Sequence, residues 1–189
     1  MSRAETRQKV FAAALDLIAE QGYTATTVEA IAERAGVAKG TVFYNFGSKE
    51  ALFSQMLEHR ITWLAEALRQ ADVGGTALEA LDAVVLEQLR FFDQYWALAR
   101  VLLAEMWRTA WQEAIAQLRS EVLGVYTDIL RRAVTQEELR EDLKVDTAAT
   151  AIFGMVLTVS IERRALYPDR PLEETHATLV DLLHGRVGR

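Results

Sequence analysis

The position of proline constrains the fold of this chain more than any other single feature. Of its 189 residues only Pro168 and Pro171 are proline, so the first 167 contain none. Proline removes a backbone donor and clashes with the preceding turn of a helix, so a long proline-free stretch favours helices. Hydrophobic residues make up 51% of the chain and recur mostly at helical spacing. We therefore expect an all-α fold with a packed core.

Capping residues and glycines predict where the helices begin and end. Gly22 closes a first helix over about residues 5–20, and Gly74 with Gly75 ends a long helix that Ser48 begins. Further helices are expected after the Thr76–Glu79 capping box, over about residues 111–134, from an N-cap at Asp146 to residue 161, and after Pro171.

Residues 26–49 have the pattern of two short helices joined by a tight turn. The first helix has an apolar face at i, i+3, i+4 and i+7, its N-cap is either Thr26 or Thr27, and Gly36 ends it. The second helix turns Val42 and Phe46 inward and leaves outside Lys39, Gly40, Thr41, Tyr44 and Asn45. This is the layout of a helix-turn-helix, whose second helix enters a DNA major groove.

The same stretch resembles the DNA-binding segment of the tetracycline-repressor (TetR) family. The matching positions are Thr26-Thr27-Val28, Ile31-Ala32, Ala35-Gly36-Val37, Lys39-Gly40-Thr41-Val42-Phe43, Phe46 and Ser48-Lys49-Glu50. They cover about the first quarter of the chain. The resemblance implies that the DNA contacts fall on Thr27, Lys39, Gly40, Thr41, Phe43, Tyr44, Asn45 and Lys49. Phe43 stands in place of a more frequent tyrosine and Asn45 in place of a common histidine, which leaves the base preference open.

The chemistry of these side chains suits both bases and phosphates. Thr41 offers a hydroxyl and a methyl to base edges, and Lys39 can reach guanine or a phosphate. Thr27 is either a helix cap only or a cap that also binds a phosphate. Lys49 stands at the positive end of a helix, where a cation is locally unfavourable unless a phosphate binds there. We expect Thr27 and Lys49 to clamp the phosphate backbone on either side of Lys39-Gly40-Thr41.

The net charge of −6 does not exclude a DNA partner, because the charge is unevenly distributed. Residues 1–50 carry six basic and six acidic side chains, so the whole negative excess lies beyond residue 50. A neutral head with locally placed cations can bind phosphates, since salt screens the more distant acidic body.

Aromatic residues gather in the middle of the sequence and suggest a cavity for an apolar or flat ligand. The alternative is that they fill a solid core. Glu105 either pairs with Arg108 or serves as the counter-charge of a cationic ligand. The candidate ligand-binding residues are Trp63, Phe92, Trp96, Glu105, Met106, Trp107, Trp111 and Tyr126.

The last two helices suggest a two-fold, four-helix interface between two copies of the chain. The helix through residues 148–161 is apolar nearly all round and must be covered on every side. The candidate interface residues are Phe153, Met155, Val156, His176, Leu179 and Leu183. We accordingly expect a DNA-binding domain over residues 1–47 and a helical ligand-binding and dimerisation domain over residues 48–189.

Other classes of function find little support in the sequence. The chain has no cysteine, its three histidines are scattered, and it shows no nucleophile motif, so we expect no enzyme, metal or cofactor. The start of the chain lacks the apolar core of a signal peptide, and the run 148–161 is shorter than the ~20 residues that span a bilayer. We expect a cytoplasmic, ligand-responsive repressor that binds a palindromic operator as a homodimer and is released by a small effector. The alternative is a DNA-binding regulator without an effector.

Overall fold

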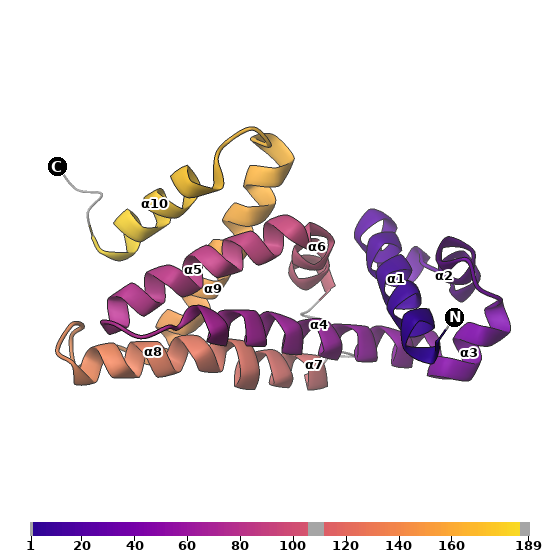
Figure 1. The fold of residues 1–189 in the computed structure, drawn as a ribbon, viewed down its shortest axis with the longest axis horizontal. Helices are drawn as coiled ribbons and strands as arrows, with labels where there is room; N and C mark the ends of the chain where they lie inside the picture. The colour runs from indigo at the N-terminus through magenta and orange to yellow at the C-terminus, as the bar shows by residue number, and fades with distance from the viewer. Residues whose placement is uncertain (1, 106–111, 186–189) are drawn as a thin grey trace.

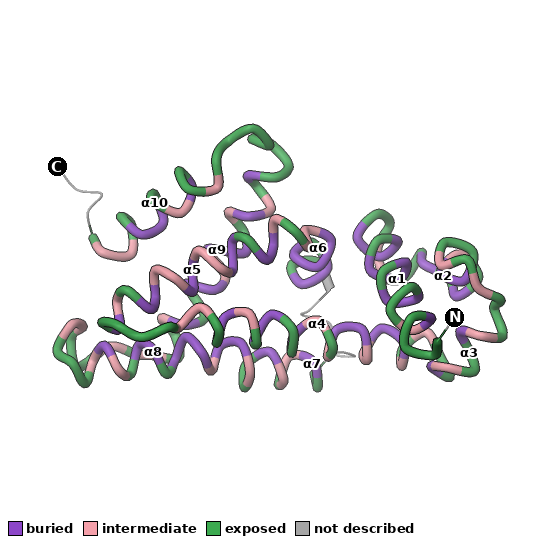
Figure 2. Tube along the Cα trace, viewed as in Figure 1, coloured by how far each residue is buried: buried purple, intermediate pink, exposed green. Residues whose placement is uncertain are grey.

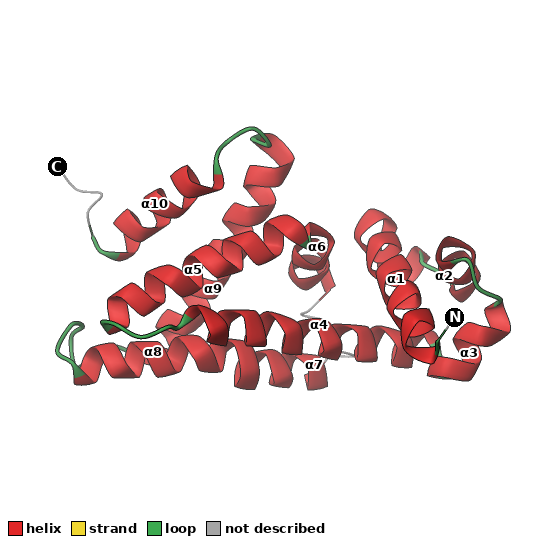
Figure 3. Cartoon of the chain, in the orientation of Figure 1, coloured by secondary structure: helices red, strands yellow, loops and turns green. Residues whose placement is uncertain are grey.

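The computed structural model describes residues 2–105 and 112–185, and within these residues every regular element is a helix (Figure 3). The all-α prediction is therefore confirmed. The elements are α1 (Arg3–Ala25), α2 (Val28–Ala35), α3 (Lys39–Phe46), α4 (Lys49–Ala71), α5 (Ala77–Gln94), α6 (Trp96–Glu105), α7 (Gln112–Gln117), the π-helix η2 (Leu118–Val122), α8 (Leu123–Thr135), α9 (Val145–Leu166) and α10 (Leu172–Leu183).

Helices α1, α2 and α3 form a small head at one end of the molecule (Figure 1). Ser2 and Glu5 cap the start of α1, and Gly22 breaks its helical geometry with φ 81° before one more turn to Ala25. Thr27, not Thr26, is the N-cap of α2, because its hydroxyl accepts a hydrogen bond from the Ala30 N–H at 3.1 Å. The Thr26 hydroxyl instead donates to the Gly22 carbonyl. The open choice of cap is thereby settled.

The turn between α2 and α3 depends on Gly36. This residue adopts the left-handed conformation with φ 66°, which glycine tolerates without strain. The N–H of Val37 donates to the Ala32 carbonyl at 3.0 Å and thus satisfies the end of α2. The predicted helix-turn-helix is present.

Helix α4 joins the head to the rest of the chain. The Ser48 hydroxyl accepts from the Ala51 N–H and starts the helix, as predicted. At 1.5 Å per residue its 23 residues span about 34 Å. In Figure 1, α4 runs from the head along the body, where it packs against α5, α7, η2 and α8.

The body consists of α5 to α10. Thr76 and Glu79 form the predicted capping box at the start of α5, which packs against α4, α8, α9 and α10. Helix α6 contacts α9 and also α1 of the head. Asp146 lies in the first turn of α9, and the N-cap is Lys144, so the prediction of an Asp146 cap was wrong.

Helix α9 is only partly covered by its own chain (Figure 2). It has 22 residues, and its most apolar stretch of 18 residues has a mean hydropathy of 1.4 and is 33% buried. By length and composition alone it could cross a membrane, a test that core helices of soluble proteins also pass. The sequence predicted a helix that ends at residue 161, and the observed helix continues to Leu166. Its uncovered apolar side needs a partner surface.

Candidate nucleic-acid interface and effector site

The outer face of α3 is available to a ligand outside the chain. Val42 and Phe46 are buried against the rest of the head, whereas Phe43 is 43% and Tyr44 80% exposed. A Cβ added at Gly40 would meet no heavy atom of the chain within 4 Å. The open surface at Gly40 would let a helix backbone approach a DNA groove closely.

Lys39 lies at the start of this face. Its ammonium group pairs with Glu29 of α2 and lies 5.6 Å from the centre of the Phe43 ring. The hydrogen bond from Lys39 is the main reason why the pKa of Glu29 lies below its ordinary value. Both side chains are more than half exposed, so solvent weakens the pair and a phosphate could replace Glu29 as partner of Lys39.

The amide of Asn45, a predicted DNA contact, is engaged within the head. Its Nδ2 donates to the Thr41 carbonyl at 2.8 Å, and its Oδ1 accepts from Arg3 Nε at 3.3 Å. Arg7 Nη1 donates to the Asn45 backbone carbonyl at 3.3 Å, and Arg7 Nη2 donates to Gln55 of α4 at 2.8 Å. These bonds connect α1, α3 and α4. Nothing in the local sequence around Arg3 and Arg7 indicates that they hold the recognition helix.

Lys49, a predicted phosphate contact, also has partners within the head. Its Nζ donates to the carbonyls of Tyr23 and Thr26, both at 2.9 Å, and lies 4.1 Å from the centre of the Tyr23 ring. The carbonyls at the end of a helix lack partners within the helix. Lys49 therefore satisfies the end of α1, and this removes the electrostatic conflict from which a phosphate contact was inferred.

The four predicted ligand-binding side chains that the structure describes, Trp63, Phe92, Trp96 and Tyr126, do not share one pocket. Phe92 and Tyr126 are buried in the core, where the Tyr126 hydroxyl donates to Gln88 and burial raises the pKa of Tyr126. Trp63 and Trp96 line two separate pockets. Met106, Trp107 and Trp111 lie outside the described residues, as does the side chain of Glu105.

A small apolar pocket lies between α6, α7, η2, α8 and α9. Its volume is about 170 Å³. Its wall is mostly aliphatic and contains three polar side chains, Arg119, Thr150 and Thr158. The apolar wall is formed by Leu102, Leu103, Ile115, Leu118, Leu123, Phe153, Gly154 and Leu157. Of these residues only Phe153 was a predicted site residue, and it was predicted for the dimer interface.

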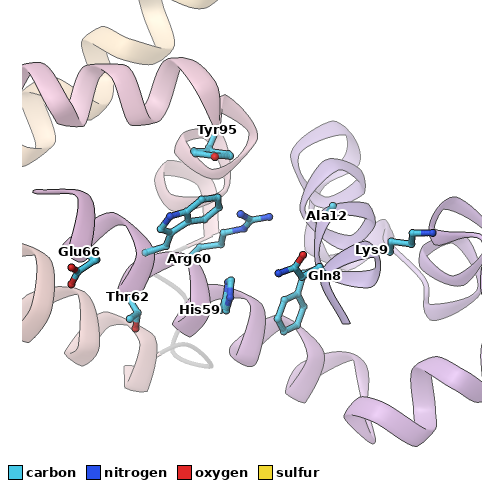
Figure 4. A pocket seen from close by; sticks show the side chains of 10 residues that line it. Gln8, Lys9, Ala12, His59, Arg60, Thr62, Glu66 and Tyr95 are labelled. Carbon is cyan, nitrogen blue, oxygen red and sulfur yellow. The ribbon is translucent and has the colours of Figure 1, made fainter. Parts of the chain in front are cut away.

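A larger pocket of about 890 Å³ lies where the head meets the body (Figure 4). Gln8, Lys9, Phe11 and Ala12 of α1 form one side of it. The other side consists of residues of α4, among them His59, Arg60 and Trp63, together with Tyr95 between α5 and α6.

Half of the candidate interface residues point into the core of their own chain. Phe153, Val156 and Leu179 are at most 5% exposed, so they offer almost no surface to a partner. A 3.6-residue periodicity cannot distinguish the inner from the outer side of a helix that is apolar all round. His176 is partly buried and its Nε2 lies 2.9 Å from the Asp82 carbonyl, while Met155 and Leu183 are also partly buried.

Two family models match the chain. One, for bacterial regulatory proteins of the tetR family, covers residues 10–56, and the other, for the tetracyclin repressor-like C-terminal domain, covers residues 74–161. The chain belongs to the TetR family. Among curated relatives of this TetR-family protein, the fatty acid metabolism regulator protein of Bacillus subtilis is 28% identical over 154 residues, which are 78% of each chain. The HTH-type transcriptional repressor KstR2 of Mycobacterium tuberculosis is 26% identical over 144 residues, 74% of this chain and 72% of that repressor.

Solved structures share the whole fold of the TetR-family chain. The fatty acid degradation regulator FadR from Bacillus halodurans aligns with a TM-score of 0.86 at 22% identity, over 99% of this chain and 98% of that one. FadR from Bacillus subtilis, solved in complex with stearoyl-CoA, aligns with a TM-score of 0.83 at 24% identity, over 96% and 99%. At these identities the likeness establishes the fold.

Proposed function

We propose that this TetR-family protein is a dimeric transcriptional repressor that binds a palindromic operator and leaves it when an apolar effector binds in the body. The observation that carries the DNA-binding part is the outer face of α3. The Phe43 and Tyr44 rings are exposed and Thr41 is partly exposed, on a helix that Val42 and Phe46 anchor in the core of the head.

For the DNA contacts we propose two groups of residues. Gly40, Thr41, Phe43 and Tyr44 face the bases and sugars, while Thr27 and Lys39 contact phosphates. We assign Asn45 and Lys49 to the internal framework of the head, because the polar groups of both side chains already have protein partners.

For dimerisation we propose the uncovered sides of α9 and α10. A dimer is needed because a palindromic operator presents two half-sites about 34–36 Å apart. Leu166 is 65% and Leu182 48% exposed, and Met155 lies partly uncovered on α9. This surface lies beyond α4 from the head, which supports the division into residues 1–47 for DNA and 48–189 for effector and partner.

For the effector we propose a molecule with an aliphatic chain that enters the pocket between α6, η2, α8 and α9. The wall of this pocket is mostly aliphatic, and Phe153 is the aromatic residue in it. The relatives agree with an apolar ligand: one regulates fatty acid metabolism, and the B. subtilis FadR structure contains stearoyl-CoA.

The size of the pocket explains how such an effector would act. About 170 Å³ is below the ~300–1,000 Å³ of typical ligand sites, so a long chain fits only after the surrounding helices move apart. A ligand that binds the expanded state better shifts the population towards it. Helix α6 contacts both α9 and α1 of the head. A displacement of α6 by the effector would therefore move α1 and with it the DNA-binding face.

A direct test selects operators from a random duplex library with the full chain and measures binding by fluorescence anisotropy. We expect a palindromic site, a dimer on it, and release by decanoyl-CoA or palmitoyl-CoA but not by free coenzyme A. Sites without two-fold symmetry would contradict the dimeric repressor. Release by none of a panel of acyl-CoA thioesters, fatty acids and steroids would favour a regulator without an effector.

The protein's relatives are regulators, and we propose that it has no enzymatic activity and acts on DNA in the cytoplasm. Within residues 2–105 and 112–185, no group of three His, Asp or Glu side chains could hold a metal ion. Purified protein that turned over an acyl-CoA substrate would contradict this proposal.

A further inference from the structure

The large pocket between head and body has a chemistry different from that of the aliphatic pocket, and the two share no lining residue. Its volume of about 890 Å³ lies within the range of small-molecule sites. Its walls combine aromatic rings with one inward-pointing cation. An aliphatic chain has no charge to pair with this cation and no ring to stack on these aromatic side chains.

Arg60 of α4 is this cation. Its guanidinium carbon lies 5.1 Å from the centre of the Trp63 ring and 5.6 Å from that of Tyr95. In Figure 4 the Arg60 side chain extends from α4 towards α1, whereas Lys9 points away from the pocket. The cation is thus held by stacking on rings, which leaves the edge of its guanidinium to other partners.

The Arg60 side chain is only partly satisfied by its own chain. Its Nε–H is buried and has no acceptor among the residues that the structure describes. Burial lowers the pKa of Arg60, although Tyr95 and Asp16 act in the opposite direction. An anion that enters the pocket would accept from the terminal Nη groups of this guanidinium in a charge-assisted hydrogen bond.

The neighbouring titratable groups leave this positive charge in place. Burial raises the pKa of Asp16, whose charge is shared between Arg34 and Arg60. Glu66 accepts a hydrogen bond from Gln70 at 2.9 Å and lies 3.7 Å from Arg69, and in Figure 4 it lies far from Arg60. Burial lowers the pKa of His59, so this ring is neutral at pH 7 and adds no second cation.

We propose that this junction pocket binds a small planar anion of the aromatic carboxylate class. Arg60 pairs with the carboxylate through its planar guanidinium, and Trp63 and Tyr95 flank the aromatic ring. Because α1 forms the opposite wall, the occupant contacts the head and α4 together. The pocket is therefore a second effector site, which acts on the angle of the head without the aliphatic pocket.

The test compares 2-naphthoate with its uncharged analogue 2-naphthylmethanol. Calorimetry on the full chain should show 2-naphthoate binding at least about tenfold more tightly than the alcohol, as expected for a hydrogen-bonded charge. Arg60→Gln should reduce the affinity for 2-naphthoate at least about tenfold and leave that for the alcohol unchanged. Naphthoate should also quench tryptophan emission in the wild type, and less so in Trp63→Phe.

Arg100→Gln is the matched control, because Arg100 lies 5.0 Å from the centre of the Trp96 ring in a different pocket. It should bind both probes like the wild type. Equal affinity of wild type and Arg60→Gln for naphthoate, an equal loss in Arg100→Gln, or no naphthoate binding at 1 mM (roughly −4 kcal/mol) would each overturn the proposal.

Two further measurements separate folding from binding and this site from the proposed function. Arg60→Lys keeps the charge but loses the planar fork, so a folded variant should still bind naphthoate more weakly than the wild type. Operator binding and its release by acyl-CoA should survive in Arg60→Gln. If release by acyl-CoA fails while naphthoate binding depends on Arg60, the aliphatic-effector proposal is wrong and the junction site stands.

Discussion

The head and the body of this protein differ in how their functional surfaces are built. In the head, the exposed face of α3 comes from eight consecutive residues, and short-range caps and glycines fix its orientation. In the body, the aliphatic pocket takes its wall from α6, α7, η2, α8 and α9, whose lining residues lie up to 56 positions apart, from Leu102 to Thr158. A surface built from one segment is visible in the sequence, whereas a surface built from five helices depends on how those helices pack.

The comparison also applies to stability. The outer face of α3 makes few contacts, so it can change without loss of folding, while Val42 and Phe46 on its inner face are part of the core. The body has no such separation, because Phe153 belongs both to the core and to the pocket wall. Changes of specificity should therefore cost less stability in the head than in the body.

The largest expected effect is the loss of stability of the head in Phe46→Ala. This substitution removes a buried ring whose centre lies 5.3 Å from the centre of the Phe11 ring, with the Arg7 guanidinium over its face. Its loss should lower the stability of the head by about 3–5 kcal/mol. Operator binding should be lost, while acyl-CoA binding by the body should persist in calorimetry. Loss of both would show that head and body unfold together, which urea unfolding followed by circular dichroism would also reveal.

Lys49→Ala and Lys39→Ala separate a framework cation from a DNA-binding one. Lys49 donates to two carbonyls, so its loss should destabilise the head by roughly 1.5–3 kcal/mol. The salt dependence of operator binding should stay as in the wild type. Lys39→Ala should leave stability nearly unchanged and reduce the slope of log K against log salt by about 0.9.

The same two measurements decide the outcome for each lysine. Urea titration gives the stability and anisotropy at several salt concentrations gives the slope. A reduced slope in Lys49→Ala would restore the phosphate contact that the sequence predicted for this residue.

Thr41→Ala should change base selection without changing the fold. Removal of its hydroxyl and methyl should relax the preference at one operator position by ~1–3 kcal/mol. Asn45→Ala should relax no single base, since its amide bonds to Thr41 and Arg3. Binding to a set of single-base operator variants measures both. Loss of one base preference in Asn45→Ala would contradict the assignment of Asn45 to the framework.

Gly154→Leu should affect only the body. A Cβ at this position meets no heavy atom within 4 Å, and the longer side chain would occupy the pocket of about 170 Å³. The acyl-CoA concentration that releases the operator should rise about tenfold, or about 1.4 kcal/mol, with operator affinity unchanged. Gly154→Ala, which leaves most of the pocket open, is the control, and equal release in both variants would exclude this pocket as the effector site.

The smallest expected effect is a pH dependence at the junction of the two regions. Burial lowers the pKa of His59, so the unfolded chain binds the proton more readily than the folded one. The stability from this residue is present above the unfolded pKa of about 6.5 and is lost as the pH falls below it. His59→Gln should flatten that part of the stability–pH curve, measured by thermal unfolding between pH 5 and pH 8 (roughly the range in which histidine titrates).

Local chemistry let the sequence determine most of the elements. The helix starts at Ser48 and Thr76 and the turn at Gly36 depend on partners at most five residues away, and each was predicted correctly. The match at residues 26–50 likewise determined the family, because a helix-turn-helix is a continuous motif. The Asp146 cap failed because α9 begins without any side-chain cap.

Tertiary structure decided which side chains remain available to a ligand. Arg3 reaches Asn45 across 42 positions and Lys49 reaches Tyr23 across 26, and neither bond has a local signature. The same holds for Phe153 and Val156 of α9 and for Leu179 of α10. Their periodicity allowed either side of the helix, and packing of α9 against α5 and α8 and of α10 against α5 buries them. Nothing in the sequence singled out Arg60. A cation on a helix can serve an anion-binding site only when other residues surround it, and here these are the Trp63 ring and the opposite wall from α1. Sequence periodicity defines the faces of each helix, and the free energy of packing all helices at once determines which face is buried.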